Sequence, residues 1–170
     1  MSQVRMFLWE LETGFKMLND VLEEITKEEA QWKPTKHTMT LDTLIQWNTR
    51  GSEWLKSQKF DPISTIEHKV VHLAQCKRMY DEYAFRNGAL TWSELEASEW
   101  PQCIADLEMA QARLMESIDT IPDEFLEDLV PTNWGDLWPI KSIIFTMIHH
   151  DAYHLGQICT VRNFFRIQNK

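Results

Sequence analysis

The last part of the chain carries two histidines at a spacing that suits metal binding. His150 and His154 are four residues apart in a segment with the pattern of one helix. Residues at positions i and i+4 share a helix face, so both imidazoles can reach a single divalent ion. His72 lies among apolar residues in an earlier helical segment, and a packed bundle could bring it to the same point. The sequence therefore predicts a metal centre with His72, His150 and His154 as nitrogen ligands.

Spacing alone also allows these histidines a purely structural role. Each buried imidazole could instead donate a hydrogen bond to a carbonyl or carboxylate, since an unsatisfied buried nitrogen costs about 1–3 kcal/mol. His68 precedes His72 by one helical turn and could replace it as a ligand. Helical rotation places His68 nearer the polar side of its helix, which favours His72. His149 is rotated by about 100° from His150 and should point elsewhere.

Other catalytic signatures are missing from the chain. The segment between His150 and His154 reads Asp-Ala-Tyr, so the His-Glu-x-x-His motif of metalloproteases is not present, and neither are a Gly-x-Ser-x-Gly elbow, a phosphate-binding loop or a dinucleotide fingerprint. Tyr153 and Gln157 could add polar groups near the site. Asp151 either orients an imidazole or faces solvent. No residue is identified as a general acid or base.

The composition is that of one ordinary globular domain, residues 1–170. The chain has 44% hydrophobic residues, enough for one core, and a formal net charge of −9, which argues against nucleic-acid binding. No apolar stretch approaches the ~20 residues that cross a bilayer, and the first residues do not resemble a secretory signal, so we expect a cytoplasmic protein. Cys76, Cys103 and Cys159 are an odd, widely spaced set that does not predict disulfides. Cys76 and Cys159 are expected to pack as small hydrophobes.

The 3.6-residue periodicity of apolar residues predicts an all-α protein without strands. Helices are expected over residues 4–25, 41–57, 64–86, 92–118 and 139–165, with Gly51 interrupting the second and a break near Pro101 in the fourth. Thr26 should cap a short acidic turn. Four long helices make a four-helix bundle, with residues 34–59 as an extra helical segment in the first connection. The length of that connection permits a crossover.

The segment 134–162 resembles the DinB/YfiT-like superfamily of candidate metalloenzymes. Its His-x-x-x-His-x-Gly-Gln pattern, from His150 to Gln157 on a final helix, is similar to part of that family's three-histidine metal site, and His72 within Val-Val-His-Leu supplies the third histidine. The resemblance implies a four-helix bundle that often forms homodimers. It also implies a divalent ion, zinc or nickel, held by His72, His150 and His154 with one open position.

The resemblance favours a thiol-dependent S-transferase that acts on a small molecule with a low-molecular-weight thiol. Two alternatives remain: a metal-dependent hydrolase, and a noncatalytic dimeric stress protein that binds metal. A fourth protein ligand, such as His68, a glutamate or Cys76, would favour the noncatalytic alternative, because structural zinc sites usually have four protein ligands. The acidic composition gives no reason to expect a nucleic-acid partner.

Overall fold

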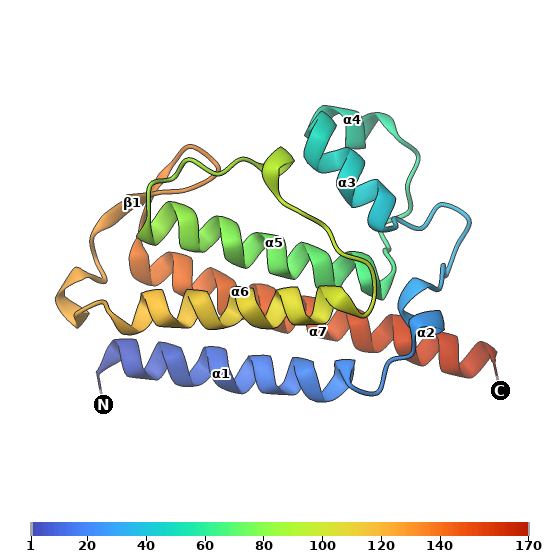
Figure 1. Ribbon diagram of the computed structural model, residues 1–170, viewed down its shortest axis with the longest axis horizontal. Helices are drawn as coiled ribbons and strands as arrows, with labels where there is room; N and C mark the ends of the chain where they lie inside the picture. Colours follow the sequence, from blue (N-terminus) through green and yellow to red (C-terminus); the bar gives the residue numbers. More distant parts are fainter. Residues whose placement is uncertain (1, 170) are drawn as a thin grey trace.

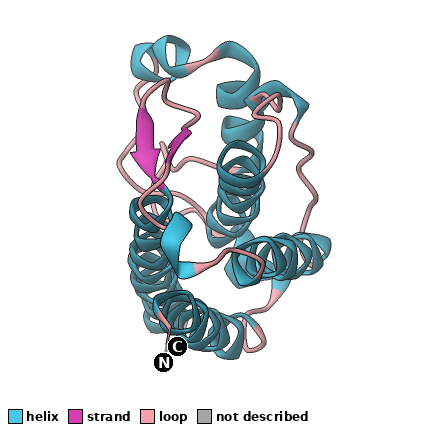
Figure 2. Cartoon of the chain, turned by 90° about the vertical axis from the view of Figure 1, so that its left-hand side faces the viewer, coloured by secondary structure: helices cyan, strands magenta, loops and turns pink. Residues whose placement is uncertain are grey.

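Four long helices form the body of the molecule in the computed structural model, which describes residues 2–169 (Figure 1). They are α1 (Gln3–Leu22), α5 (Ile66–Phe85), α6 (Gln102–Asp119) and α7 (Ile140–Gln168). α1 packs against α6 and α7, and α5 packs against the same two helices. Figure 2, which looks nearly along the helix axes, shows the four helices around a shared interior. The all-α bundle expected from the periodicity is confirmed.

The crossover lies in the second long connection, not in the first. Figure 1 shows that α1 and α7 run in one direction and that α5 and α6 run in the opposite one. The connection from α1 to α5 begins and ends at the same end of the bundle. Residues 86–101 then travel back along α5 to the start of α6 (Figure 1). Two parallel neighbouring helices require such a return, because the chain must cover a full helix length between them.

The shorter helices differ from the expected boundaries. α2 (Lys27–Gln31) begins at Thr26, whose side chain accepts a hydrogen bond from the Glu29 amide while the Glu29 carboxylate accepts one from the Thr26 amide. The predicted helix 41–57 is two helices, α3 (Leu41–Arg50) and α4 (Ser52–Ser57), because Gly51 takes a φ of 81° that ends one helix and starts the next. The predicted helix 92–118 is helical only from Gln102 onward, where α6 begins. Before that point the segment contains a single 3₁₀ turn, η1 (Trp92–Glu94).

A small hairpin was missed by the sequence prediction. β1 (Leu129–Pro131) pairs antiparallel with β2 (Leu137–Pro139), after the 3₁₀ turn η2 (Asp123–Phe125). Gly135 takes a φ of 90° in the connecting turn, a conformation that favours glycine. Strands of three residues are too short to show an alternating pattern, so periodicity could not predict them.

α5 is the central helix, and it is buried on nearly every side. α6 and α7 cover its bundle face, and α3, α2 and β1 contact it as well. His68 is therefore only 6% exposed, and the prediction that it lies on a more polar face than His72 was wrong. A rotation argument assumes one covered side, whereas α5 has several. Within the described residues, none of the helices combines the length and apolar character needed to cross a membrane.

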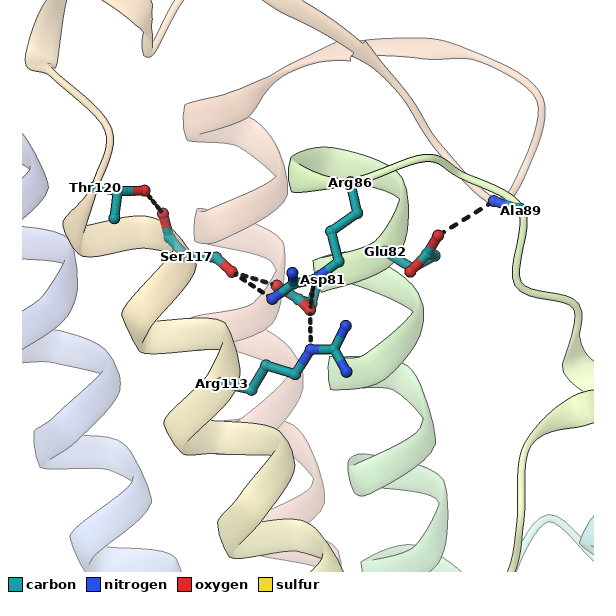
Figure 3. Close-up of polar contacts among 7 residues, drawn as sticks. All are labelled: Asp81, Glu82, Arg86, Ala89, Arg113, Ser117 and Thr120. Carbon is teal, nitrogen blue, oxygen red and sulfur yellow. Dashed lines mark hydrogen bonds and ion pairs between the residues drawn. The ribbon is translucent and has the colours of Figure 1, made fainter.

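A buried carboxylate joins the ends of α5 and α6 (Figure 3). Asp81 is 1% exposed. Its Oδ2 accepts hydrogen bonds from Arg86 Nε at 2.7 Å and Arg113 Nε at 2.8 Å, and its Oδ1 accepts one from Ser117 Oγ at 2.6 Å. The two guanidinium groups offset the cost of burying the carboxylate. This cluster ties the C-terminal part of α5 to that of α6.

Removing this carboxylate should destabilise the fold. Asp81→Ala is expected to lower the free energy of unfolding by about 2–3 kcal/mol, because hydrogen bonds to charged groups are lost. Glu82→Ala is the matched control, since the Glu82 carboxylate accepts a long hydrogen bond, from the Ala89 amide at 3.4 Å (Figure 3). This variant should change the free energy by less than about 0.5 kcal/mol. Urea denaturation measures both. Equal losses for the two variants would contradict the role given to Asp81.

Candidate metal centre

α5 supplies one histidine of the cluster and α7 supplies two. Thr65 caps α5, with its hydroxyl accepting a hydrogen bond from the His68 amide, and His72 follows two turns into the helix. α7 is unbroken from Ile140 to Gln168, so His150 and His154 keep their i and i+4 relation on one face. α5 packs directly against α7. The helices therefore bring together the three histidines that the sequence singled out.

Two of the nitrogen separations within the cluster suit a shared ion. His150 Nε2 lies 3.3 Å from His72 Nε2 and 3.1 Å from His154 Nε2. The rings of His72 and His154 have centroids 5.1 Å apart. Two nitrogens bound to one tetrahedral ion at about 2.0–2.1 Å are separated by about 3.3 Å. The two Nε2 separations therefore match those of ligands around one metal.

Burial keeps these imidazoles neutral at physiological pH. Desolvation, followed by repulsion from neighbouring charges, lowers the pKa of His150 and that of His154 to about 4 and holds the pKa of His72 well below its usual value. Neutral imidazole is the form that binds metal. The ligands therefore need not lose a proton before an ion can bind.

Gln157 fixes which nitrogen of His154 is free. Gln157 Oε1 accepts hydrogen bonds from His154 Nδ1 at 2.9 Å and from Lys69 Nζ at 3.1 Å, and Lys69 also donates to Ser64 Oγ at 2.7 Å. With Nδ1 protonated, neutral His154 presents an unprotonated Nε2 to the cluster. Gln157 was expected near the site. Lys69 was not, because a lysine between Ser64 and Val70 carries no signal in the sequence.

The donor set fits a cation at its centre. His154 Nε2 carries a lone pair, and His150 Nε2 contacts it and His72 Nε2 at once. A proton on His150 Nε2 can form a well-aligned hydrogen bond to only one of these two neighbours. In the other contact, two ring nitrogens face each other without a hydrogen bond. A divalent ion bound by all three nitrogens removes that conflict. The cluster is therefore well suited to hold a divalent metal.

Cys76 adds a fourth potential ligand. Its Sγ lies 3.6 Å from His72 Nε2, and the ligand atoms of His72, Cys76 and His150 all lie within 4.8 Å of one another. Burial raises the pKa of the Cys76 thiol to about 12, so a metal would have to displace its proton. Cys76 is buried, as expected for a small hydrophobe, but its position beside the histidines came only from the fold. Cys159 is half-buried and lies elsewhere on α7.

His68 sits behind His72 and not in the cluster. The two rings are nearly parallel with centroids 6.3 Å apart, and both ring nitrogens of His68 are buried without a hydrogen-bond partner. Burial lowers the pKa of His68 to about 3. His149 is exposed and packs against Phe145, while His37 is exposed on a loop. Neither contributes to the site, in agreement with their helical rotation and polar surroundings.

The metal-free protein should lose stability as the pH falls from about 7 to about 4. His68, His150 and His154 have low pKa values in the folded protein, whereas in the unfolded chain they take up protons near pH 6.5. The unfolded state binds more protons in this window, so the free energy of unfolding falls as the pH falls. His68→Leu should flatten this dependence and keep full zinc binding, as measured by urea denaturation at several pH values and by elemental analysis. An unchanged slope, with exposed His37→Leu as the control, would contradict the assignment of His68.

Asp151 has a partner that the sequence did not indicate. It is 4% exposed and forms an ion pair with Lys77, which is 2% exposed, through Nζ and Oδ2 at 2.5 Å. The expectation that Asp151 orients an imidazole or faces solvent was wrong, because α5 covers that side of α7. Lys77 Nζ also lies 5.8 Å from the centre of the Phe15 ring on α1. The ion pair thus joins the two helices that carry the histidines.

A cavity of about 510 Å³ opens beside the cluster, with His72, Cys76 and His150 in its wall. Its other walls come from connections outside the bundle: Trp47 on α3, Trp92 on η1 and Trp134 in the β1–β2 turn. Figure 1 shows these connections gathered on the side of α5 that faces away from α1. A small molecule in this cavity would lie against the histidines.

The molecule is a helical bundle with a cluster of histidines between α5 and α7 and a cavity beside that cluster. It therefore belongs to the class of helical proteins that have a candidate divalent-metal site. The sequence pattern of the DinB superfamily matches residues 10–158, and the chain therefore belongs to the DinB superfamily. No curated protein matches the chain significantly.

Proposed function

We propose that the protein is a metal-dependent enzyme in which His72, His150 and His154 hold one divalent ion, zinc or nickel, and that it transfers the sulfur of a low-molecular-weight thiol to a small electrophile. The observation that carries the proposal is the convergence of three imidazoles, with Nε2 separations of 3.1 and 3.3 Å, two of which, His72 and His150, line a cavity. Catalytic zinc sites typically have three protein ligands and one open position. The choice of a thiol follows from the family.

The chain's own residues would prepare the site for this reaction. A bound zinc ion would supply a Lewis acid that keeps a thiol ionised near neutral pH. Gln157 holds His154 in the required tautomer, and the aromatic residues of the cavity wall would reduce the water around a bound substrate. In the overall transfer the thiolate sulfur forms a bond to the electrophilic carbon, the thiol proton passes to solvent, and the leaving group departs with the electron pair of its broken bond.

A noncatalytic metal site is the second candidate, and Cys76 favours it. A zinc-bound nitrogen and a zinc-bound sulfur are about 3.6 Å apart, which equals the 3.6 Å between Cys76 Sγ and His72 Nε2. With Cys76 as a fourth ligand the ion would have no open position and would serve stability. The thiol transferase is preferred because a cavity opens beside the cluster, where a substrate can approach His72 and His150.

Cobalt(II)-substituted protein separates these functions. 2-Mercaptoethanol should change the cobalt absorption spectrum, and the protein should consume it together with 1-chloro-2,4-dinitrobenzene and release chloride. Turnover of an ester without any thiol would instead support a hydrolase. A spectrum that is insensitive to added thiol but changes in Cys76→Ser would support the noncatalytic site. Either of the last two results would overturn the proposed transfer.

We also propose that the protein acts as a homodimer in the cytoplasm. All three cysteines are free, which suits a reducing compartment. Large apolar side chains are exposed on two neighbouring helices, α1 and α7, and contacts between copies would cover them; they are Met6, Trp9, Met17, Phe145, Tyr153, Phe164 and Ile167. Sedimentation velocity tests the assembly, and a monomer at every concentration would contradict it.

A further inference from the structure

The cavity beside the histidine cluster has no formally charged wall. None of the twelve described residues that line it is lysine, arginine, aspartate or glutamate. His72 and His150 in this wall are candidate ligands of the ion, and the rest of the wall is the uncharged part. The polar groups in the wall are neutral side chains, namely Asn48, Ser52 and Asn133. This neutrality stands out in a chain with a formal net charge of −9.

An uncharged wall selects against charged ligands. Away from the candidate metal ligands, a carboxylate or sulfonate would lose its hydration without gaining a cationic partner, and an ammonium group would lose its hydration without gaining an anionic one. Neutral amides and hydroxyls can still hydrogen-bond an uncharged polar group and set its orientation. The cavity therefore favours an uncharged molecule.

The remaining wall is largely aromatic. Trp47, Trp92, Trp134 and Tyr80 line the cavity together with Met79. The rings of Tyr80 and Trp134 pack edge to face with centroids 5.7 Å apart, and the Trp47 ring lies within 18° of parallel to His72. Tryptophan and tyrosine present broad flat surfaces to a ligand, and their ring pairs prefer stacked or edge-to-face contacts. A flat ring is the shape that such walls hold best.

We propose that the substrate entering this cavity is an uncharged molecule with a flat aromatic group of one or two rings. The volume of about 510 Å³ is within the range of small-molecule sites and accommodates a group of that size. In the S-transferase proposed above, the substrate's reactive atom would face His72 and His150. The reaction rests on that proposed function, whereas the selection of a neutral aromatic ligand rests on the cavity alone.

A matched pair of fluorescent probes tests the selection on the metal-free protein. N-phenyl-1-naphthylamine is uncharged, and 8-anilinonaphthalene-1-sulfonate has the same ring skeleton with one negative charge. The neutral probe should bind at one saturable site, at least about tenfold more tightly than the sulfonate, a ratio that corresponds to about 1.4 kcal/mol. Equal affinities, or tighter binding of the sulfonate, would overturn the proposal.

Three variants locate the binding. Trp134→Ala should weaken the neutral probe about tenfold through loss of an aromatic ring from the cavity wall, whereas Trp9→Ala, an exposed tryptophan on α1, should leave it unchanged. Asn133→Lys places a cation in the cavity wall and should tighten binding of the sulfonate, an effect that a purely structural role of Asn133 would not produce. Binding that is insensitive to Trp134→Ala would show that the probe lies elsewhere and overturn the assignment.

Two thiols test whether the preference for uncharged aromatic molecules also holds for a ligand that reaches the metal. In cobalt-substituted protein, benzyl mercaptan should change the cobalt spectrum at lower concentration than 4-(mercaptomethyl)benzoic acid, which adds one carboxylate. If neither thiol changes the spectrum but the neutral fluorescent probe still binds, the proposed function fails and the ligand selection stands. If both thiols bind equally well, the metal function stands and the selection fails.

Discussion

Alanine in place of His72, His150 or His154 is expected to abolish stoichiometric zinc binding. Each variant removes one of three nitrogen ligands. Loss of a residue that only hydrogen-bonds a ligand lowers metal affinity roughly 10- to 100-fold. Loss of a ligand itself should lower the zinc affinity by more than that. Gln157→Ala should fall within that smaller range, because it removes only the hydrogen bond to His154 Nδ1. Elemental analysis after dialysis, followed by competition with a chromophoric chelator, measures both effects.

The control for these variants is His149→Ala. His149 lies on the same helix but is exposed, so its removal should leave zinc binding intact. Cys76→Ala adds a further distinction: it should preserve stoichiometric zinc in a three-histidine site and reduce it in a four-ligand site. Full metal content in all three ligand variants would mean that the histidines do not hold the ion.

Breaking the ion pair between Lys77 and Asp151 should have the largest effect on stability. Both side chains are almost fully buried, and their charged atoms are 2.5 Å apart. Asp151→Leu leaves the Lys77 ammonium without a partner, and Lys77→Met leaves the Asp151 carboxylate alone. Each single variant should lower the free energy of unfolding by about 3–5 kcal/mol, a large part of the 5–15 kcal/mol typical of a domain.

The double variant Lys77→Met/Asp151→Leu provides the decisive comparison. Apolar residues of similar volume need no hydration, so the pair should regain most of the stability that either single variant loses. Urea denaturation of the metal-free proteins gives the coupling free energy without a contribution from bound metal. Additive losses in the double variant would show that the two side chains do not depend on each other.

The sequence determined the class of the fold and the candidate ligands. Apolar residues at three- and four-residue spacing predicted the long helices, because a helix must bury one face to be stable. The same periodicity placed His150 and His154 one turn apart on one face of α7, a local relation that needs no knowledge of the fold. Thr26 marked a helix start for a similarly local reason, since its side-chain oxygen satisfies an amide of the first turn.

Only the tertiary structure decided which distant residues meet. The direction of the crossover, the pairing of Lys77 with Asp151 and the position of Cys76 beside His72 all depend on how α5 packs against its neighbours. The aromatic wall of the cavity comes from three connections that lie far apart along the chain. Contacts between such segments are set by the packing of whole helices. Periodicity along one helix shows which side is covered, but it does not show what covers it.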